Sequence, residues 1–203
     1  MIIESQKIIL LHPGKTGGTS VEHTLKDLFL KRKKLIAKEE DLDMMFGLSK
    51  KYNLFLQHAD LRFYKNILNT NFNNYKTITT VRNPYDRLVS CYYYNGKDKK
   101  FTFEDFILNH LEAHIEANNK KGYGFNHFAP QINFCKIDDY VVNHIIRLEN
   151  FTNDLKEINI DVKYNYSKTI SRKKGYKDYY NQNTKDIVYQ LYKEDFEYLN
   201  YEY

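Results

Sequence analysis

The sequence predicts an α/β domain in which helices flank a central, mostly parallel sheet. Short apolar segments that are typical of buried strands alternate with segments of helical periodicity. Polar residues directly follow three of the predicted strands, where the ligands of parallel sheets bind. The 203 residues suffice for one domain with a real core, and no linker or internal repeat divides them. We therefore expect residues 1–203 to form a single domain.

Each strand is predicted from a short apolar run that is rich in β-branched or aromatic residues. These runs occupy residues 8–11, 54–56, 78–81, 140–142 and 145–146. The first run stops at Pro13 and Gly14, which favour a turn. The third stops at Asn83 and Pro84, a residue pair that suits the start of a helix.

Helices are predicted where apolar residues recur every three or four positions. They are expected from residue 18, from residue 84, at residues 101–117, at residues 151–158 and at residues 184–199. The second helix should end near Asn95 and Gly96, since Gly is a common helix terminator. The last helix should be broken near Lys193.

Composition and charge limit the classes of function. A net charge of +5 fits an anionic ligand, and no motif of basic and aromatic residues suggests a nucleic-acid partner. Cys91 and Cys135 are expected to be buried free thiols, and no Cys/His spacing suggests a metal site. The charged N-terminus does not look like a signal peptide, and no segment has the ~20 apolar residues of a membrane span. A cytoplasmic protein is therefore expected.

Residues 12–20 join the first strand to the first helix and look like a cradle for an anion. Glycines let main-chain N–H groups turn toward one point, and the start of a helix adds unpaired N–H donors. Lys15 adds a positive charge, and three hydroxyl side chains add donors. A nucleotide triphosphatase loop would need a glycine at the position of Ile9, and no strand-terminal Asp is placed to hold Mg²⁺. A nucleotide or small-molecule kinase is kept as the alternative.

Residues 81–94 carry a second set of polar groups. Arg82 is expected to project from a strand end, and Arg87, Ser90 and Tyr94 to share one face of the following helix. Guanidinium groups and a hydroxyl suit a phosphate monoester. A non-catalytic nucleotide-binding or nucleic-acid-binding module is the alternative from another class.

Both segments resemble the nucleotide-binding motifs of sulfotransferases. Residues 13–20 are similar to the family's Pro-Lys-Thr-Gly-Gly-Thr-Ser loop, with Gly14 intervening, and residues 82–92 to its Arg-Asn-Pro-x-x-Arg-x-x-Ser-x-Tyr motif. The resemblance to the carbohydrate-type branch, sulfotransferase family 2, lies in residues 126–131, in residues 145–151 and in the tail. The resemblance covers residues 8–201 and implies a three-layer, P-loop-like fold.

This resemblance implies a donor, an acceptor class and a set of binding residues. The donor would be 3′-phosphoadenosine 5′-phosphosulfate (PAPS), with adenosine 3′,5′-bisphosphate as product and no metal. The implied donor-binding residues are Lys15, Thr16, Gly17, Gly18, Thr19, Ser20, Arg82, Ser90, Arg172 and Lys173. The acceptor would carry a hydroxyl, on a glycan or glycoconjugate by the branch resemblance; lipids, small alcohols and peptidyl tyrosine stay open. The sequence does not indicate the oligomeric state.

Transfer to a hydroxyl benefits from a general base. His58 follows a predicted strand, where family members with a catalytic histidine place it, so His58 is the expected base. His127, Glu39 and Glu40 are the alternatives. Lys15 is the second expected catalytic residue, because it would neutralise charge on the leaving phosphate oxygen.

Overall fold

The structure is a computed structural model that describes residues 1–30, 44–45, 47–49, 54–119, 127–161 and 175–203. The expected residues Arg172 and Lys173 lie outside this part of the chain, as do Glu39 and Glu40. The strands are β1 (Ile2–Ile3), β2 (Ile8–Leu11), β3 (Met44–Met45), β4 (Leu48–Ser49), β5 (Leu54–Phe55), β6 (Lys76–Val81), β7 (Lys136–Ile137), β8 (Tyr140–Val141) and β9 (His144–Arg147). The α-helices are α1 (Gly18–Leu25), α2 (Leu61–Leu68), α3 (Pro84–Tyr94), α4 (Phe103–Asn109), α5 (Leu111–Asn119), α6 (Phe151–Glu157), α7 (Gln182–Leu191) and α8 (Lys193–Leu199).

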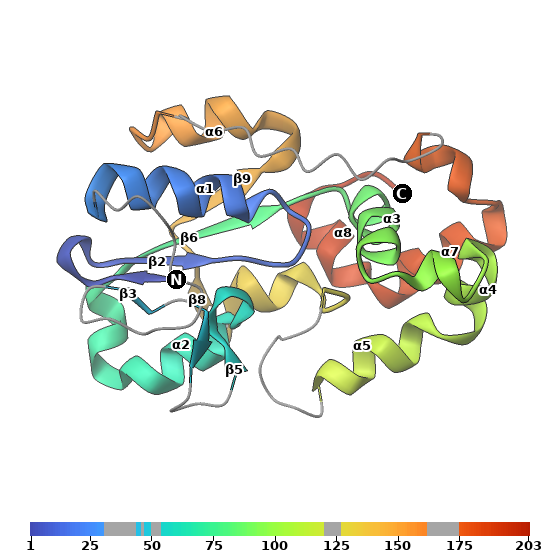
Figure 1. Cartoon of the computed structure of the whole chain (residues 1–203), viewed down its shortest axis with the longest axis horizontal. Coiled ribbons are helices and arrows are strands. Elements are labelled where there is room, and N and C mark those ends of the chain that lie inside the picture. The colour runs from blue at the N-terminus through green and yellow to red at the C-terminus, as the bar shows by residue number, and fades with distance from the viewer. Residues whose placement is uncertain (31–43, 46, 50–53, 120–126, 162–174) are drawn as a thin grey trace.

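The central sheet has the strand order β3-β1-β2-β6-β9. Strands β2, β6 and β9 are parallel, while β1 pairs antiparallel with both β2 and β3. The predicted mixed α/β class with a mostly parallel sheet is thereby confirmed. Because β2 and β6 run in the same direction, the loops that follow them emerge at the same edge of the sheet (Figure 1).

Helices cover both faces of this sheet (Figure 1). On one face, buried Leu10 packs in a cluster with Val21 of α1 and Leu155 of α6. On the other, buried Ile9 packs in a cluster with Phe63 of α2. The alternation of Ile9 and Leu10 follows from the period of two in a strand. Full burial of each such side chain stabilises the fold by about 1.5–3 kcal/mol.

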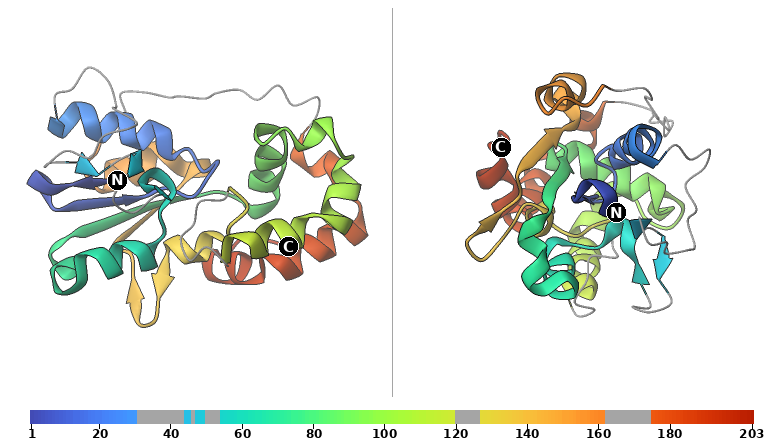
Figure 2. Two further views of the ribbon diagram at one scale, coloured as in Figure 1. Left: turned by 60° about the horizontal axis from the view of Figure 1, so that its bottom comes forward. Right: turned by 90° about the vertical axis from the view of Figure 1, so that its left-hand side faces the viewer.

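A group of helices lies beyond the carboxyl ends of β2 and β6. Helices α3, α4, α5, α7 and α8 gather there, as both Figure 1 and the left view of Figure 2 show. Their shared core is aromatic and includes Tyr92, Phe106 and Phe196. This packing holds the start of α3 against the edge of the sheet where the loops emerge.

Three expectations about the elements were wrong in detail. The strand at Leu54–Phe55 pairs with β4 in a separate two-stranded sheet, and Tyr140–Val141 pairs with β7 in another. Residues 101–117 form two helices instead of one, because His110 leaves the helical region at φ −132° and its ring packs 4.0 Å from that of Phe101. The break expected near Lys193 is confirmed.

Candidate functional site

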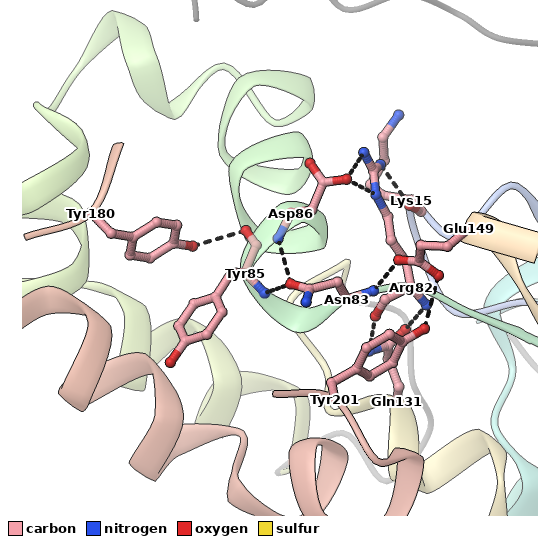
Figure 3. A network of polar contacts seen from close by, with 9 residues as sticks. All are labelled: Lys15, Arg82, Asn83, Tyr85, Asp86, Gln131, Glu149, Tyr180 and Tyr201. Carbon is pink, nitrogen blue, oxygen red and sulfur yellow. Dashed lines mark hydrogen bonds and ion pairs between the residues drawn. The ribbon is translucent and has the colours of Figure 1, made fainter. Parts of the chain in front are cut away.

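The site is built where β2 and β6 end side by side. The loop that follows β2 carries Lys15, and Arg82 comes directly after β6. The Nη1 atom of Arg82 donates a hydrogen bond to the carbonyl oxygen of Lys15 at 3.3 Å (Figure 3). The two polar segments singled out in the sequence are therefore in direct contact.

The loop after β2 depends on glycines, which allow its main chain to approach neighbouring side chains closely. Gly17 has φ 84°, in the left-handed region that favours glycine, and it caps the start of α1. A Cβ atom on Gly18 would overlap the His12 ring, and one on Gly14 would overlap the His127 ring. The main chain of this loop is thus packed against two imidazoles, with its N–H groups at the positive end of α1.

The other residues of the loop differ in where their side chains go. Lys15 takes the left-handed conformation at φ 69°, which costs a non-glycine residue about 1 kcal/mol or more. Its Nζ atom lies 3.9 Å from the centroid of the Tyr94 ring. The Thr16 hydroxyl is fully buried and hydrogen-bonds to Pro13 O and Thr80 Oγ1, both at 2.7 Å. Thr16 therefore shapes the loop through its side chain.

The last two residues of the predicted loop lie in the first turn of α1. Thr19 is half-buried, whereas Ser20 is buried at 4% exposure. The N–H of Ser20 donates to Gly17 O at 3.0 Å. The structure thus brings Lys15 to Ser20 together in one turn that ends in the helix start.

Arg82 is held from two directions (Figure 3). Its Nε and Nη2 atoms donate to Oδ2 of Asp86 at 2.8 and 2.5 Å. Its main-chain N–H and C=O both bond to the side-chain amide of Gln131, at 2.9 Å each. Gln131 is anchored in turn, since its N–H donates to buried Asp195 at 2.8 Å. The guanidinium is therefore fixed in orientation before any ligand arrives.

Arg87, the second arginine of the motif, has a structural role. Arg87 is buried, and its guanidinium donates to the carbonyl oxygens of Gly14, His127 and Ala129 at 2.6–3.0 Å. It ties α3 to the loop after β2 and to the segment before Gln131. Ser90, one turn further along α3, is also buried, at 4% exposure.

Three histidine rings form a row beside the loop. The ring centroids of His12 and His58 are 4.9 Å apart, and so are those of His58 and His127. Tyr94 continues the row, with its ring edge-on to His127 at 4.9 Å. Although β5 is not part of the central sheet, His58 still reaches the edge at which Lys15 and Arg82 lie.

The hydrogen bond of His58 fixes its tautomer. Its Nδ1 atom lies 2.9 Å from the carbonyl oxygen of His12. Because a carbonyl oxygen can only accept, Nδ1 carries the proton and Nε2 keeps its lone pair. Burial, with repulsion from His12, lowers the pKa of His58 to about 4. Burial, with the charges of His58 and Lys15, lowers the pKa of His127 to about 3. Both rings are neutral at pH 7 and available to accept a proton.

A cavity of about 320 Å³ lies on the other side of the start of α3. Asn83, Tyr85, Tyr180 and Lys185 are among its lining residues, and Lys15, Arg82 and His58 are not. The hydroxyls of Tyr85 and Tyr180 are already bonded to main-chain oxygens within its wall. The reactive groups therefore belong to the sheet edge and not to this cavity.

Sequence reasoning missed the partners that hold the site residues in place. Asp86 and Gln131 fix Arg82, and buried Glu22 pairs with His12 at 2.9 Å. A signal for Glu22 was present, because it stands between Val21 and Leu25 on the side of α1 that faces the core. A charged residue there requires a buried partner.

Two features are absent from the part of the chain that the structure describes. Within the described residues, no group of three or more His, Cys, Asp or Glu side chains could hold a metal ion. Among the same residues, no helix has the length and apolar character needed to cross a membrane.

Comparison with known proteins identifies the family. Residues 1–202 match the model described as "Sulfotransferase family", in the branch sulfotransferase family 2. Neither a curated protein nor a solved structure matches the chain. The match covers essentially the whole chain and includes both segments that meet at the site. The chain therefore belongs to the sulfotransferase family, which implies a transferase that acts on a hydroxyl acceptor.

Proposed function

We propose that the chain transfers a sulfuryl group from PAPS to a hydroxyl of a carbohydrate. The contact between Arg82 and Lys15 carries this proposal, because it joins two anion-binding segments at one edge of a parallel sheet. A donor with a phosphosulfate at one end and a phosphate at the other needs two such segments at a fixed separation. We also propose that residues 1–203 form one domain of the three-layer, P-loop-like type.

The residues at the site fit the two charged ends of PAPS. Residues 15–20 would hold the 5′-phosphosulfate through main-chain N–H groups and the Lys15 ammonium. The glycines leave no Cβ atoms between these donors and an anion. Arg82 and Ser90 would hold the 3′-phosphate, and Arg172 and Lys173, which lie outside the described residues, would cover it.

His58 and Lys15 would carry the chemistry. PAPS supplies the activated sulfuryl group. His58 Nε2 accepts the acceptor's hydroxyl proton while the hydroxyl oxygen bonds to sulfur and the bond from sulfur to the phosphate oxygen breaks. Lys15 neutralises the charge that grows on that leaving oxygen. A sulfuryl group carries less charge than a phosphoryl group, so the transfer depends less on a metal ion.

The surroundings of the proposed base favour a sugar as the acceptor. The Tyr94 side chain is 53% exposed, and its ring adjoins both Lys15 and His127. A sugar presents C–H groups on its face and hydroxyls at its edge, so an aromatic ring flanked by polar groups suits it. This arrangement would bring an edge hydroxyl toward the histidine row.

Calorimetric titration with adenosine 3′,5′-bisphosphate tests the donor. We expect micromolar binding that does not require Mg²⁺ and that Arg82→Ala weakens at least tenfold, because charged hydrogen bonds contribute about 1.5–3 kcal/mol each. Arg62→Ala, which changes an exposed arginine of α2, is the matched control and should bind as wild type. Tight binding of ATP with Mg²⁺ in place of the bisphosphate would instead make the chain a kinase.

A further inference from the structure

Glu22 is a buried carboxylate whose two oxygens are both occupied. It is 0% exposed, and its Oε1 atom lies 2.9 Å from Nδ1 of His12. Its Oε2 atom accepts a hydrogen bond from Nε2 of Gln57 at 2.9 Å. A carboxylate in an apolar interior is costly unless it is paired and hydrogen-bonded in this way. These two partners therefore stabilise a negative charge that is buried behind the histidine row.

The neighbours of Glu22 keep it ionised. Burial alone would raise the pKa of its carboxyl group, but the attraction and hydrogen bond of His12 bring the pKa below its usual value. His12 is itself buried at 4% exposure, and its ring packs on the main chain at Gly18. Glu22 thus anchors His12, the first residue of the loop after β2.

The contacts of Glu22 lead directly to His58. Gln57 precedes His58 in the chain, and the carbonyl oxygen of His12 accepts the Nδ1 proton of His58. Glu22 thus holds both the residue before the proposed base and the residue that fixes its tautomer. We propose that Glu22 is a positioning residue for His58, acting through His12 and Gln57 to keep Nε2 unprotonated and turned toward the acceptor. This inference rests on the proposed role of His58 as base.

The charges around His58 give Glu22 a second effect. His12 faces His58 from the end of β2, His127 from the segment before Gln131, and the amino group of Met1 from the sheet. Lys15 acts on His127, whose pKa its charge lowers. Glu22 carries a negative charge, and its attraction raises the pKa of His58 against the effects of burial and His12, which lower it. Its removal should make His58 a weaker base.

The first test is nitrogen-15 NMR of the histidine rings in the wild-type protein and in Glu22→Gln. In wild type, His58 should carry its proton on Nδ1. Glu22→Gln keeps the shape and removes the charge, so the His58 titration should move to lower pH and kcat at neutral pH should fall roughly tenfold. The affinity for adenosine 3′,5′-bisphosphate should stay within a factor of about two.

Two further variants separate positioning from general stability. Glu22→Asp retains the charge and should leave the His58 titration near its wild-type position. Asp154→Asn removes a remote carboxylate that also accepts two hydrogen bonds, from Arg147 N and Asn150 Nδ2, and it should change neither the titration nor kcat.

An unshifted His58 titration in folded Glu22→Gln, or an Nε2-protonated His58 in wild type, would overturn the proposal. An Nε2-protonated His58 in wild type would overturn it even if the variant does not fold. Since both NMR readouts are independent of turnover, a protein that transfers no sulfuryl group would refute the proposed function without deciding the role of Glu22.

Discussion

The guanidinium of Arg82 bonds to the carbonyl oxygen of Lys15 at 3.3 Å, which links the end of β6 to the loop after β2. Lys15 has the left-handed backbone conformation, and this hydrogen bond supports its carbonyl group. Asp86 fixes the rest of the guanidinium (Figure 3). An anion bound at one segment is therefore expected to depend on the integrity of the other.

Arg82→Lys should weaken the binding of a ligand that lacks the 3′-phosphate. Lysine keeps the charge but loses the planar fork that reaches both Asp86 and Lys15 O. We expect adenosine 5′-phosphosulfate to bind roughly three- to tenfold more weakly, by calorimetry, because the loop loses its support. Arg62→Lys on α2 is the control. Unchanged affinity for this ligand would mean that the two segments act independently.

Gly18→Ala should destabilise the fold without requiring a strained backbone. The added Cβ would overlap the buried His12 ring, and overpacking of this kind costs about 1–3 kcal/mol. Scanning calorimetry should show Tm lowered by roughly 5 °C. At Gly175 the nearest atom to a new Cβ is 3.4 Å away, so Gly175→Ala should have little effect on Tm. Equal Tm values for the two variants would show that His12 can move aside.

His58→Asn should separate binding from turnover. The asparagine amide can still donate to His12 O, while the lone pair of Nε2 is lost. We expect kcat to fall about 10²- to 10⁴-fold with unchanged affinity for the bisphosphate. His127→Asn, measured in the same sulfuryl-transfer assay, should reduce kcat by less than about tenfold. The reverse order of the two effects would make His127 the base.

The site could be predicted from the sequence because each half of the site follows a strand of the central sheet. The apolar runs at residues 8–11 and 78–81 are long enough to be recognised, and the residues after them meet at one edge. Strands of two residues carry no usable periodicity. For that reason β1 was not predicted, and the sheet to which Leu54–Phe55 belongs was misjudged.

Tertiary contacts account for what the sequence left undetermined at the site. The capped helix α2 was missed, although Asp60 accepts from Phe63 N as a cap should. The anchors Asp86, Gln131 and Glu22 are ordinary polar residues until the fold brings them to Arg82 and His12. Such partners are defined by contacts between distant segments, which spacing along the chain does not reveal.

The neutral histidines should make the protein less stable as the pH falls below 6.5. The folded-state pKa of His58 is about 4, whereas the unfolded chain takes up that proton near the ordinary histidine pKa of 6.5. Protons therefore favour the unfolded state throughout this window, and the stability present above pH 6.5 is lost progressively down to about pH 4. A shift of this size corresponds to about 2 kcal/mol between pH 7 and pH 4.5. Urea unfolding at the two pH values should show that His58→Asn loses about 2 kcal/mol less than wild type. The same loss in both proteins would mean that the pKa of His58 in the folded protein lies near 6.5 and that burial does not lower it.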